Sequence, residues 1–146
     1  MAITKVDFSQ LNILVIDDSP FVRKLVEEVL TSFGVGGIFS TDSADKAFAQ
    51  MEANCPDLII CDWQMHPVDG LTFLRKLRQD FAARYPAIPF IMLTGHSANE
   101  DVSKAIGEGA NSYIVKPFSA QTLMNHLLKV IVSEKEPVDN REEWIL

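Results

Sequence analysis

The sequence predicts a doubly wound α/β fold, in which a parallel five-stranded sheet is covered by five helices. Short apolar runs typical of buried strands alternate with segments whose apolar residues recur every three or four positions, as in amphipathic helices. Glycine, proline and capping residues separate the two kinds of segment. Polar residues directly follow four of the apolar runs. In a parallel sheet these residues all fall at one edge, where such folds bind ligands.

The first strand and helix have the clearest pattern. Residues 12–16 form an apolar run that stops at Asp17 and Asp18, and Ser19-Pro20 is a favourable start for a helix. Gly34 is a typical C-terminal stop. The helix between them is predicted from an apolar face of Val22, Leu25, Val26, Val29, Leu30 and Phe33.

The other elements follow the same alternation. A weak second strand is expected at residues 37–39, and the other strands at residues 58–61, 88–93 and 112–115. The second helix is expected to begin after Thr41, Asp42 or Ser43, and the next three after Gly70, near Asn99 and after Ser119. Right-handed connections between parallel strands then place helices on both faces of the sheet.

Charge, apolar stretches and cysteines limit the partners and the compartment expected for the protein. The 146 residues carry a net charge of −7 with a pI of about 4.8, which disfavours nucleic acid and anionic membranes as partners. Neither a signal peptide nor an apolar stretch long enough to span a bilayer is visible, so a soluble cytoplasmic protein without membrane insertion is expected. Cys55 and Cys61 are expected to be reduced thiols.

The polar residues at the strand ends predict a cation site. Asp17, Asp18 and Asp62 would repel one another unless a cation lay among them. A small number of hard oxygen ligands, with room left for water, suits Mg²⁺. With Thr94 and Lys116 at the same edge, the set favours phosphoryl chemistry, and one carboxylate could be the nucleophile. A flavodoxin-like cofactor binder is disfavoured because no phosphate-binding loop follows the first strand.

These motifs closely resemble the response-regulator receiver domain of two-component signalling. The matching residues are Asp17-Asp18, Asp62, Thr94-Gly95 and Lys116-Pro117-Phe118, in this order after the first, third, fourth and fifth strands. The resemblance covers residues 11–132, between an N-terminal extension (1–10) and a C-terminal tail (133–146). It implies the strand order 2-1-3-4-5 of the flavodoxin-like receiver fold.

The resemblance also implies the site. Asp62 would accept the phosphoryl group, with Thr94 and Lys116 assisting the reaction. Mg²⁺ would be held by Asp17, Asp18, Asp62 and the backbone carbonyl of Gln64. In the family the bond from the lysine to Pro117 is cis, and Gly95 leaves room for the phosphate. Thr94 and Tyr113 would form the switch, with Tyr113 rotating inward as Thr94 moves.

The function implied is that of a stand-alone response regulator in a phosphorelay. A histidine kinase or phosphotransfer protein would donate the phosphoryl group. The chain would be a signalling domain rather than an enzyme, with self-catalysed phosphorylation and dephosphorylation. A downstream protein would bind the face of the fourth helix, fifth strand and fifth helix, about residues 99–132. The alternative is an interaction module that does not depend on phosphorylation.

Several features remain open at the level of the sequence. His66-Pro67 departs from the usual family loop, and the positions of Gln64 and His96 tune phosphate lifetime in the family. His66 and His96 are two loop histidines or, alternatively, a metal site or pH-sensitive gate. His126 is expected at the surface or its boundary. The tail residues Trp144-Ile145-Leu146 either fray or dock.

Overall fold

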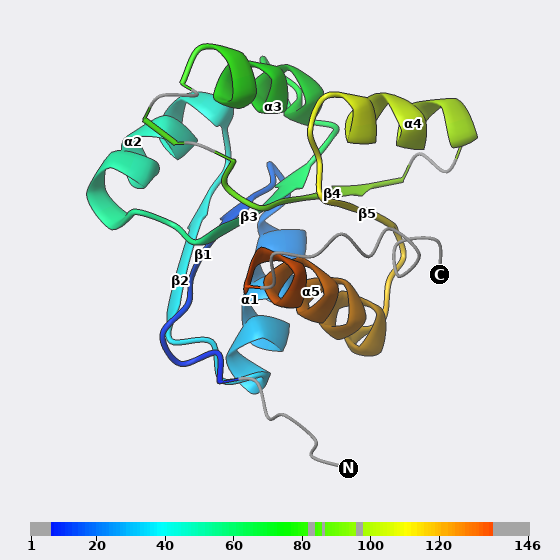
Figure 1. The fold of residues 1–146 in the computed structure, drawn as a ribbon. Helices are drawn as coiled ribbons and strands as arrows, with labels where there is room; N and C mark the ends of the chain where they lie inside the picture. The colour runs from blue at the N-terminus through cyan, green and yellow to red at the C-terminus, as the bar shows by residue number, and fades with distance from the viewer. Residues whose placement is uncertain (1–6, 82–83, 86, 96–97, 136–146) are drawn as a thin grey trace.

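A parallel sheet of five strands lies at the centre of the computed structural model, which describes residues 7–81, 84–85, 87–95 and 98–135 (Figure 1). The strand order is β2-β1-β3-β4-β5. Both the α/β class and the order implied by the resemblance are therefore confirmed. The strands are β1 (Asn12–Ile16), β2 (Gly37–Thr41), β3 (Leu58–Asp62), β4 (Phe90–Thr94) and β5 (Ser112–Val115).

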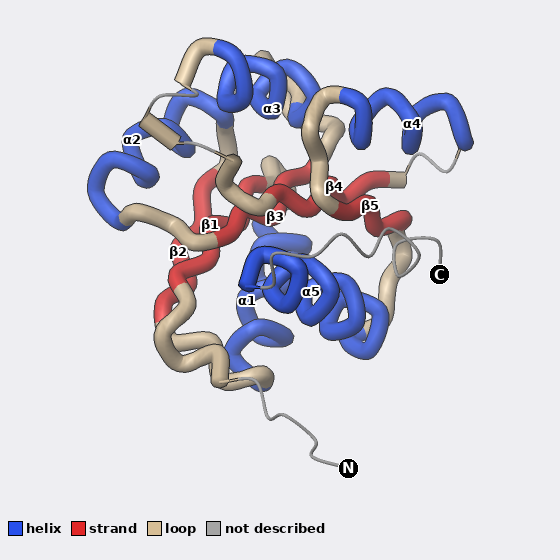
Figure 2. The backbone as a smooth tube through the Cα atoms, in the orientation of Figure 1, coloured by secondary structure: helices blue, strands red, loops and turns tan. Residues whose placement is uncertain are grey.

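Five helices cover the two faces of the sheet. Helices α1 and α5 lie on one face and α2, α3 and α4 on the other (Figures 1 and 2). Their bounds are α1 (Pro20–Ser32), α2 (Ala44–Asn54), α3 (Gly70–Gln79), α4 (Asn99–Gly107) and α5 (Ala120–Lys135). In the described part of the chain, no helix combines the length and apolarity needed to cross a bilayer.

The sheet separates two apolar cores. Successive side chains of a strand point to opposite faces, so Ile13 packs with α1 and α5 while Leu14 packs with α2 and α3. Every residue of β3 and β4 is buried, as expected for central strands covered on both sides. The third helix buries the predicted face of Leu71, Leu74 and Leu77.

Local signals in the sequence account for most element boundaries. The Ser19 hydroxyl accepts a hydrogen bond from the backbone N–H of Val22, and Pro20 is the first residue of α1. Gly34 follows the helix with a φ of +85°, a conformation that favours glycine. Among the three candidates for the start of α2, Ser43 is the N-cap. Helix starts and stops were therefore largely predictable from cap residues.

Three details differ from the sequence prediction. Strand β2 continues to Thr41 rather than Phe39, because its whole length pairs with β1. Strand β4 begins at Phe90 rather than Ile88. Leu25, assigned to the apolar face of α1, is 39% exposed because the buried face centres on Val26 and Leu30 and leaves Leu25 at its margin.

The register of the sheet brings the strand ends together. Ile16 lies opposite Cys61, Asp62 opposite Leu93, and Thr94 opposite Val115. The residues at or just after these positions therefore share the carboxyl edge of the sheet. Cys61 is a buried thiol of the core, Cys55 is exposed, and both are free.

Candidate functional site

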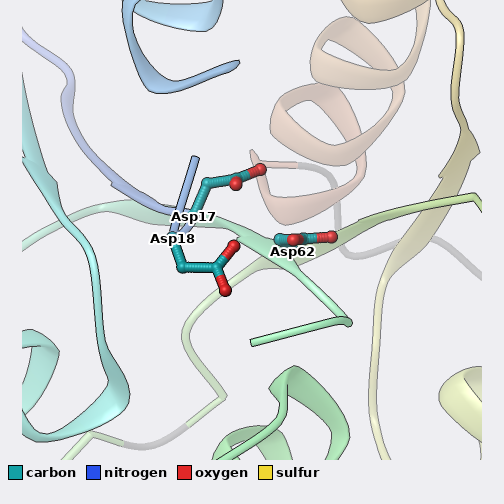
Figure 3. A group of neighbouring side chains, drawn as sticks. All are labelled: Asp17, Asp18 and Asp62. Carbon is teal, nitrogen blue, oxygen red and sulfur yellow. The ribbon is translucent and has the colours of Figure 1, made fainter. Parts of the chain in front are cut away.

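Three carboxylates meet beyond the ends of β1 and β3. One oxygen from each of Asp17, Asp18 and Asp62 lies within 4.8 Å of the others (Figure 3). Asp17 and Asp62 are buried and Asp18 is exposed, so the cluster opens to solvent on one side. Hard oxygen donors with access to water fit a small divalent cation such as Mg²⁺. This cluster is therefore an acidic pocket that could bind a metal ion.

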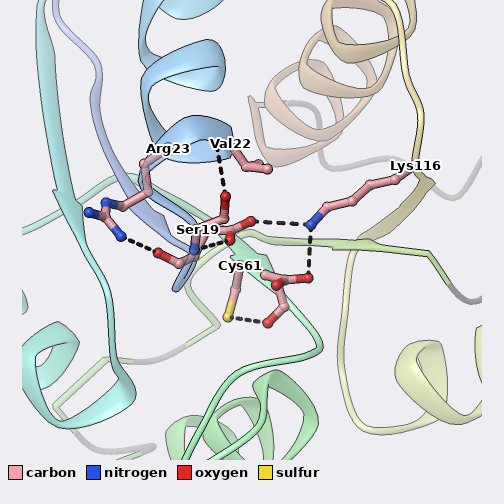
Figure 4. Close-up of polar contacts among 7 residues, drawn as sticks. Ser19, Val22, Arg23, Cys61 and Lys116 are labelled. Atoms are coloured by element: carbon pink, nitrogen blue, oxygen red, sulfur yellow. Dashed lines mark hydrogen bonds and ion pairs between the residues drawn. The ribbon is translucent and has the colours of Figure 1, made fainter.

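Lys116 bridges the two buried acids. Its Nζ lies 3.3 Å from Asp17 Oδ2 and 3.2 Å from Asp62 Oδ1 (Figure 4). The residue follows β5, and its backbone N–H donates to the carbonyl of Thr94 at 2.7 Å. The peptide bond from Lys116 to Pro117 is cis, as the resemblance implied. One ammonium group thus faces three carboxylates, which leaves the pocket with a net negative charge.

Burial is the main influence on the Asp62 carboxyl. The pKa of Asp62 is raised above its ordinary value by desolvation and then by the negative charge of Asp17. The Lys116 ammonium and a hydrogen bond from the Gln64 backbone act in the opposite direction. A cation in the pocket would also stabilise the ionised form. Without a cation in the pocket, the ionised form of Asp62 is therefore less favourable than that of an ordinary aspartate.

Thr94 and Tyr113 form a second polar pair at the same edge. Thr94, the last residue of β4, is fully buried, and its side chain shares a hydrogen bond with the Tyr113 hydroxyl. Desolvation raises the pKa of the Tyr113 phenol. The Tyr113 ring also meets Trp63 edge to face, with ring centroids 6.3 Å apart at 84°. Trp63 directly follows Asp62, so Tyr113 is linked by contacts to both Thr94 and the Asp62 loop.

The loop after Asp62 folds tightly against the start of α3. The backbone N–H of Gly70 donates to the Trp63 carbonyl at 2.7 Å, and Asp69 caps the helix. A Cβ on Gly70 would lie 2.2 Å from the Asp62 carbonyl oxygen, so only glycine permits this approach. Gln64 lies in this loop and is exposed. The geometry of the Asp62 backbone is thus set by α3 as well as by the sheet.

Comparison with known proteins decides the family. The family model described as the response regulator receiver domain matches residues 13–128. The chain belongs to the response-regulator receiver family. Chemotaxis protein CheY1 of Helicobacter pylori is 33% identical over 122 residues, which are 83% of this chain and 97% of the relative. Chemotaxis protein CheY-3 of Vibrio cholerae is 30% identical over 120 residues, 82% and 91% of the two chains.

Solved receiver structures have the same fold. Chemotaxis protein CheY4 of Vibrio cholerae aligns with a TM-score of 0.75 and 28% identity, over 82% of this chain and 98% of that one. A putative response regulator from Chloroflexus aurantiacus aligns with a TM-score of 0.77 and 29% identity, over 84% and 98%. Receiver domains are signalling domains of two-component systems, so this class of function applies to the chain.

The structure of this receiver brings the predicted residues of the pocket together. Asp17, Asp18, Asp62 and Lys116 share one pocket, and Thr94 is linked to it through the backbone of Lys116. Tyr113, the predicted aromatic switch, is half-buried beside Thr94. The pocket residues followed from the strand ends, whereas Tyr113, inside β5, followed from the resemblance to the receiver family.

Of the histidines singled out in the sequence, His66 and His126 lie in the described part of the chain. His66 is exposed and is joined to Pro67 by a cis peptide bond. His96 and the tail segment 136–146 lie outside the described residues. His126 on α5 is half-buried at the boundary of the protein, and its Nδ1 forms a short hydrogen bond with the Ser112 hydroxyl. Desolvation lowers the pKa of His126.

Two residues of this receiver were missed by sequence reasoning. The Arg23 guanidinium contacts the backbone of Asp17, and the Trp63 ring contacts Tyr113. Arg23 and Trp63 each lie within six positions after a strand-end aspartate, and this closeness in sequence was the one signal available for them. A side-chain contact with a backbone carbonyl leaves no periodic pattern in the sequence.

Proposed function

We propose that this receiver is a cytoplasmic response regulator that accepts a phosphoryl group on Asp62 in a Mg²⁺-dependent reaction. The donor would be a histidine kinase or a phosphotransfer protein. The observation that carries the proposal is the pocket itself: Asp62 is buried beside two further carboxylates and is contacted by the Lys116 ammonium. Residues 11–132 would form the receiver, which modifies itself rather than turning over an external substrate.

The acidic residues would hold the cation. Asp17, Asp18 and Asp62, with the backbone carbonyl of Gln64, would bind Mg²⁺ directly or through water. When bound, the cation neutralises negative charge on the incoming phosphoryl oxygens. The carboxylate cluster fits this role because one side is buried and fixed while Asp18 faces solvent.

Asp62 would act as the nucleophile. An oxygen of its carboxylate attacks the phosphorus, and the bond from phosphorus to the donor histidine breaks as the imidazole leaves. The product is an acyl phosphate. Lys116 Nζ, which pairs with Asp62 at 3.2 Å, then lies where it can neutralise a phosphoryl oxygen. Thus the ammonium that holds the carboxylate before the reaction would stabilise the product after it.

Thr94 and Tyr113 would report the modification. The Thr94 hydroxyl, which now shares a hydrogen bond with the Tyr113 side chain, would donate to a phosphoryl oxygen. Tyr113 would then rotate inward and change the surface formed by α4, β5 and α5, where a downstream protein would bind. Ile106 and Val115 are exposed apolar side chains on this face and support its use as a docking surface.

Intact-mass spectrometry after incubation with acetyl phosphate and Mg²⁺ tests the proposal. Wild-type protein should gain one phosphoryl group, and chelation of Mg²⁺ should abolish the gain. Asp62→Asn should gain none. Asp57→Asn is a matched control, because Asp57 is an exposed aspartate at the opposite end of β3. Equal labelling of wild type and Asp62→Asn would refute the proposal and favour an interaction module independent of phosphorylation.

A further inference from the structure

Arg23 reaches back from the first turn of α1 to the strand that precedes it. Its Nη1 donates a hydrogen bond of 2.7 Å to the backbone carbonyl of Asp17 (Figure 4). The side chain is half-buried, which limits competition from water for this bond. A charged donor to a partly buried carbonyl is stronger than a bond between neutral groups. Arg23 therefore restrains the backbone between β1 and α1.

The restraint acts on the two acids through one peptide plane. The carbonyl oxygen of Asp17 and the backbone nitrogen of Asp18 belong to the same planar unit. Holding that oxygen fixes the orientation of the plane, and with it the direction in which the Asp18 side chain leaves the backbone. Rotation of the plane would swing the Asp18 carboxylate relative to Asp17 and Asp62.

Asp17 is also held by other contacts, so loss of the Arg23 hydrogen bond should displace the Asp18 carboxylate more than that of Asp17. The N–H of Asp17 donates to the Thr41 carbonyl at 3.1 Å, its Oδ1 accepts from the Ser19 N–H at 2.9 Å, and its Oδ2 pairs with Lys116. Asp18 is exposed, and its place in the cluster depends on the backbone that carries it. The hydrogen bond from Arg23 is thus positioned to govern the third carboxylate of the pocket.

We propose that Arg23 is a positioning residue that presents the Asp18 carboxylate to the cation. This inference rests on the proposed Mg²⁺ site and adds a residue that does not touch the metal. Interactions with the outer partners of metal ligands commonly change metal affinity by tenfold or more. Loss of the Arg23 side-chain donors should therefore weaken Mg²⁺ binding about tenfold.

The direction of the change in Mg²⁺ affinity shows whether Arg23 acts by positioning Asp18 or only by its charge. Arg23 is a cation near a cation site, so its charge alone opposes Mg²⁺ binding. Removing that charge would strengthen binding if Arg23 had no other influence. A weaker affinity after its removal can thus arise only if the hydrogen bond to Asp17 matters more than the repulsion.

The experiment compares Mg²⁺ dissociation constants of four proteins. Arg23→Met keeps an apolar stem but removes every donor, and Arg23→Lys keeps the charge and one donor. Lys24→Met is the matched control, since Lys24 is an exposed cation on the same turn of α1. Binding is followed by the fluorescence of Trp63, next to Asp62, in a Trp144→Phe background. Phosphorylation by acetyl phosphate is measured separately at saturating Mg²⁺.

Arg23→Met is expected to raise the dissociation constant about tenfold. Arg23→Lys should raise the constant about two- to threefold, and Lys24→Met should bind as wild type. Equal or tighter binding by Arg23→Met, or an equal loss in Lys24→Met, overturns the proposal. If wild-type protein itself fails to bind Mg²⁺ or to label, the proposed function fails instead.

Thermal unfolding of the metal-free proteins identifies a variant that does not fold. If Arg23→Met is such a variant, Arg23→Lys decides the question. Its single ammonium donor replaces a forked guanidinium, so its dissociation constant should rise about two- to threefold. An unchanged or tighter constant in Arg23→Lys then overturns the proposal.

Discussion

Replacement of Lys116 by methionine removes the ammonium group that joins the two buried acids of the pocket. The Nζ lies 3.2 and 3.3 Å from the two carboxylate oxygens. At an effective dielectric constant of about 20, each contact has a gross Coulomb energy of about 5 kcal/mol. Desolvation cancels much of this, and the Lys116 side chain is 26% exposed. Because Lys116 is partly exposed, we expect a net loss of about 2 kcal/mol, below the roughly 3–5 kcal/mol of fully buried ion pairs.

The assay for Lys116→Met is thermal and urea unfolding without divalent cations at pH 7.5. A loss of about 2 kcal/mol lowers Tm by roughly 6 °C in a domain of this size. Saturating Mg²⁺ should return more stability to Lys116→Met than to wild type, because the variant pocket has one more net negative charge. A variant as stable as wild type without Mg²⁺, or one that gains less from Mg²⁺, would refute this electrostatic reasoning.

Three further predictions concern the pocket and its supports. Gly70→Ala should lower the free energy of unfolding by about 2 kcal/mol and slow phosphorylation, because the new Cβ would lie 2.2 Å from the Asp62 carbonyl oxygen. Unchanged urea unfolding and an unchanged labelling rate would contradict this. Asn111→Ala, which removes the acceptor of the buried Phe90 N–H, should cost about 2 kcal/mol in the same assay yet leave the labelling rate at saturating Mg²⁺ as in wild type. The raised pKa of Asp62 makes its ionised form unfavourable in the fold, so the metal-free stability of wild type relative to Asp62→Asn should improve as pH falls from 7.5 through the folded pKa. A relative stability that worsens over this range in urea unfolding would show that the Asp62 pKa is lowered instead.

The strand-end residues show why most of the pocket was predictable. Asp17, Asp62 and Lys116 each follow an apolar run, and parallel strands necessarily bring such positions to one edge. Ser19 and Gly34 likewise marked the ends of α1 by local backbone chemistry. These features depend on short stretches of sequence and on one topological rule.

What the sequence did not predict depends on tertiary contacts. The apolar pattern of α1 placed Leu25 in the core, but the packing of α1 on the sheet leaves that side chain at the margin. The contact between Arg23 and the Asp17 carbonyl depends on the path of one long side chain between two elements. The edge-to-face contact of Trp63 with Tyr113 crosses from the β3 loop to β5. No periodicity within a segment encodes such contacts.

The position of the phosphoryl group is the most direct test of the central claim. Borohydride reduces an acyl phosphate of aspartate to homoserine, and peptide sequencing by mass spectrometry then identifies the modified position. After incubation with acetyl phosphate and Mg²⁺, we expect homoserine at position 62, and the unmodified residues Asp17 and Asp18 beside it in the pocket. Homoserine at position 17 or 18, or none in protein that has gained phosphoryl mass, would contradict the assignment of Asp62 as the nucleophile.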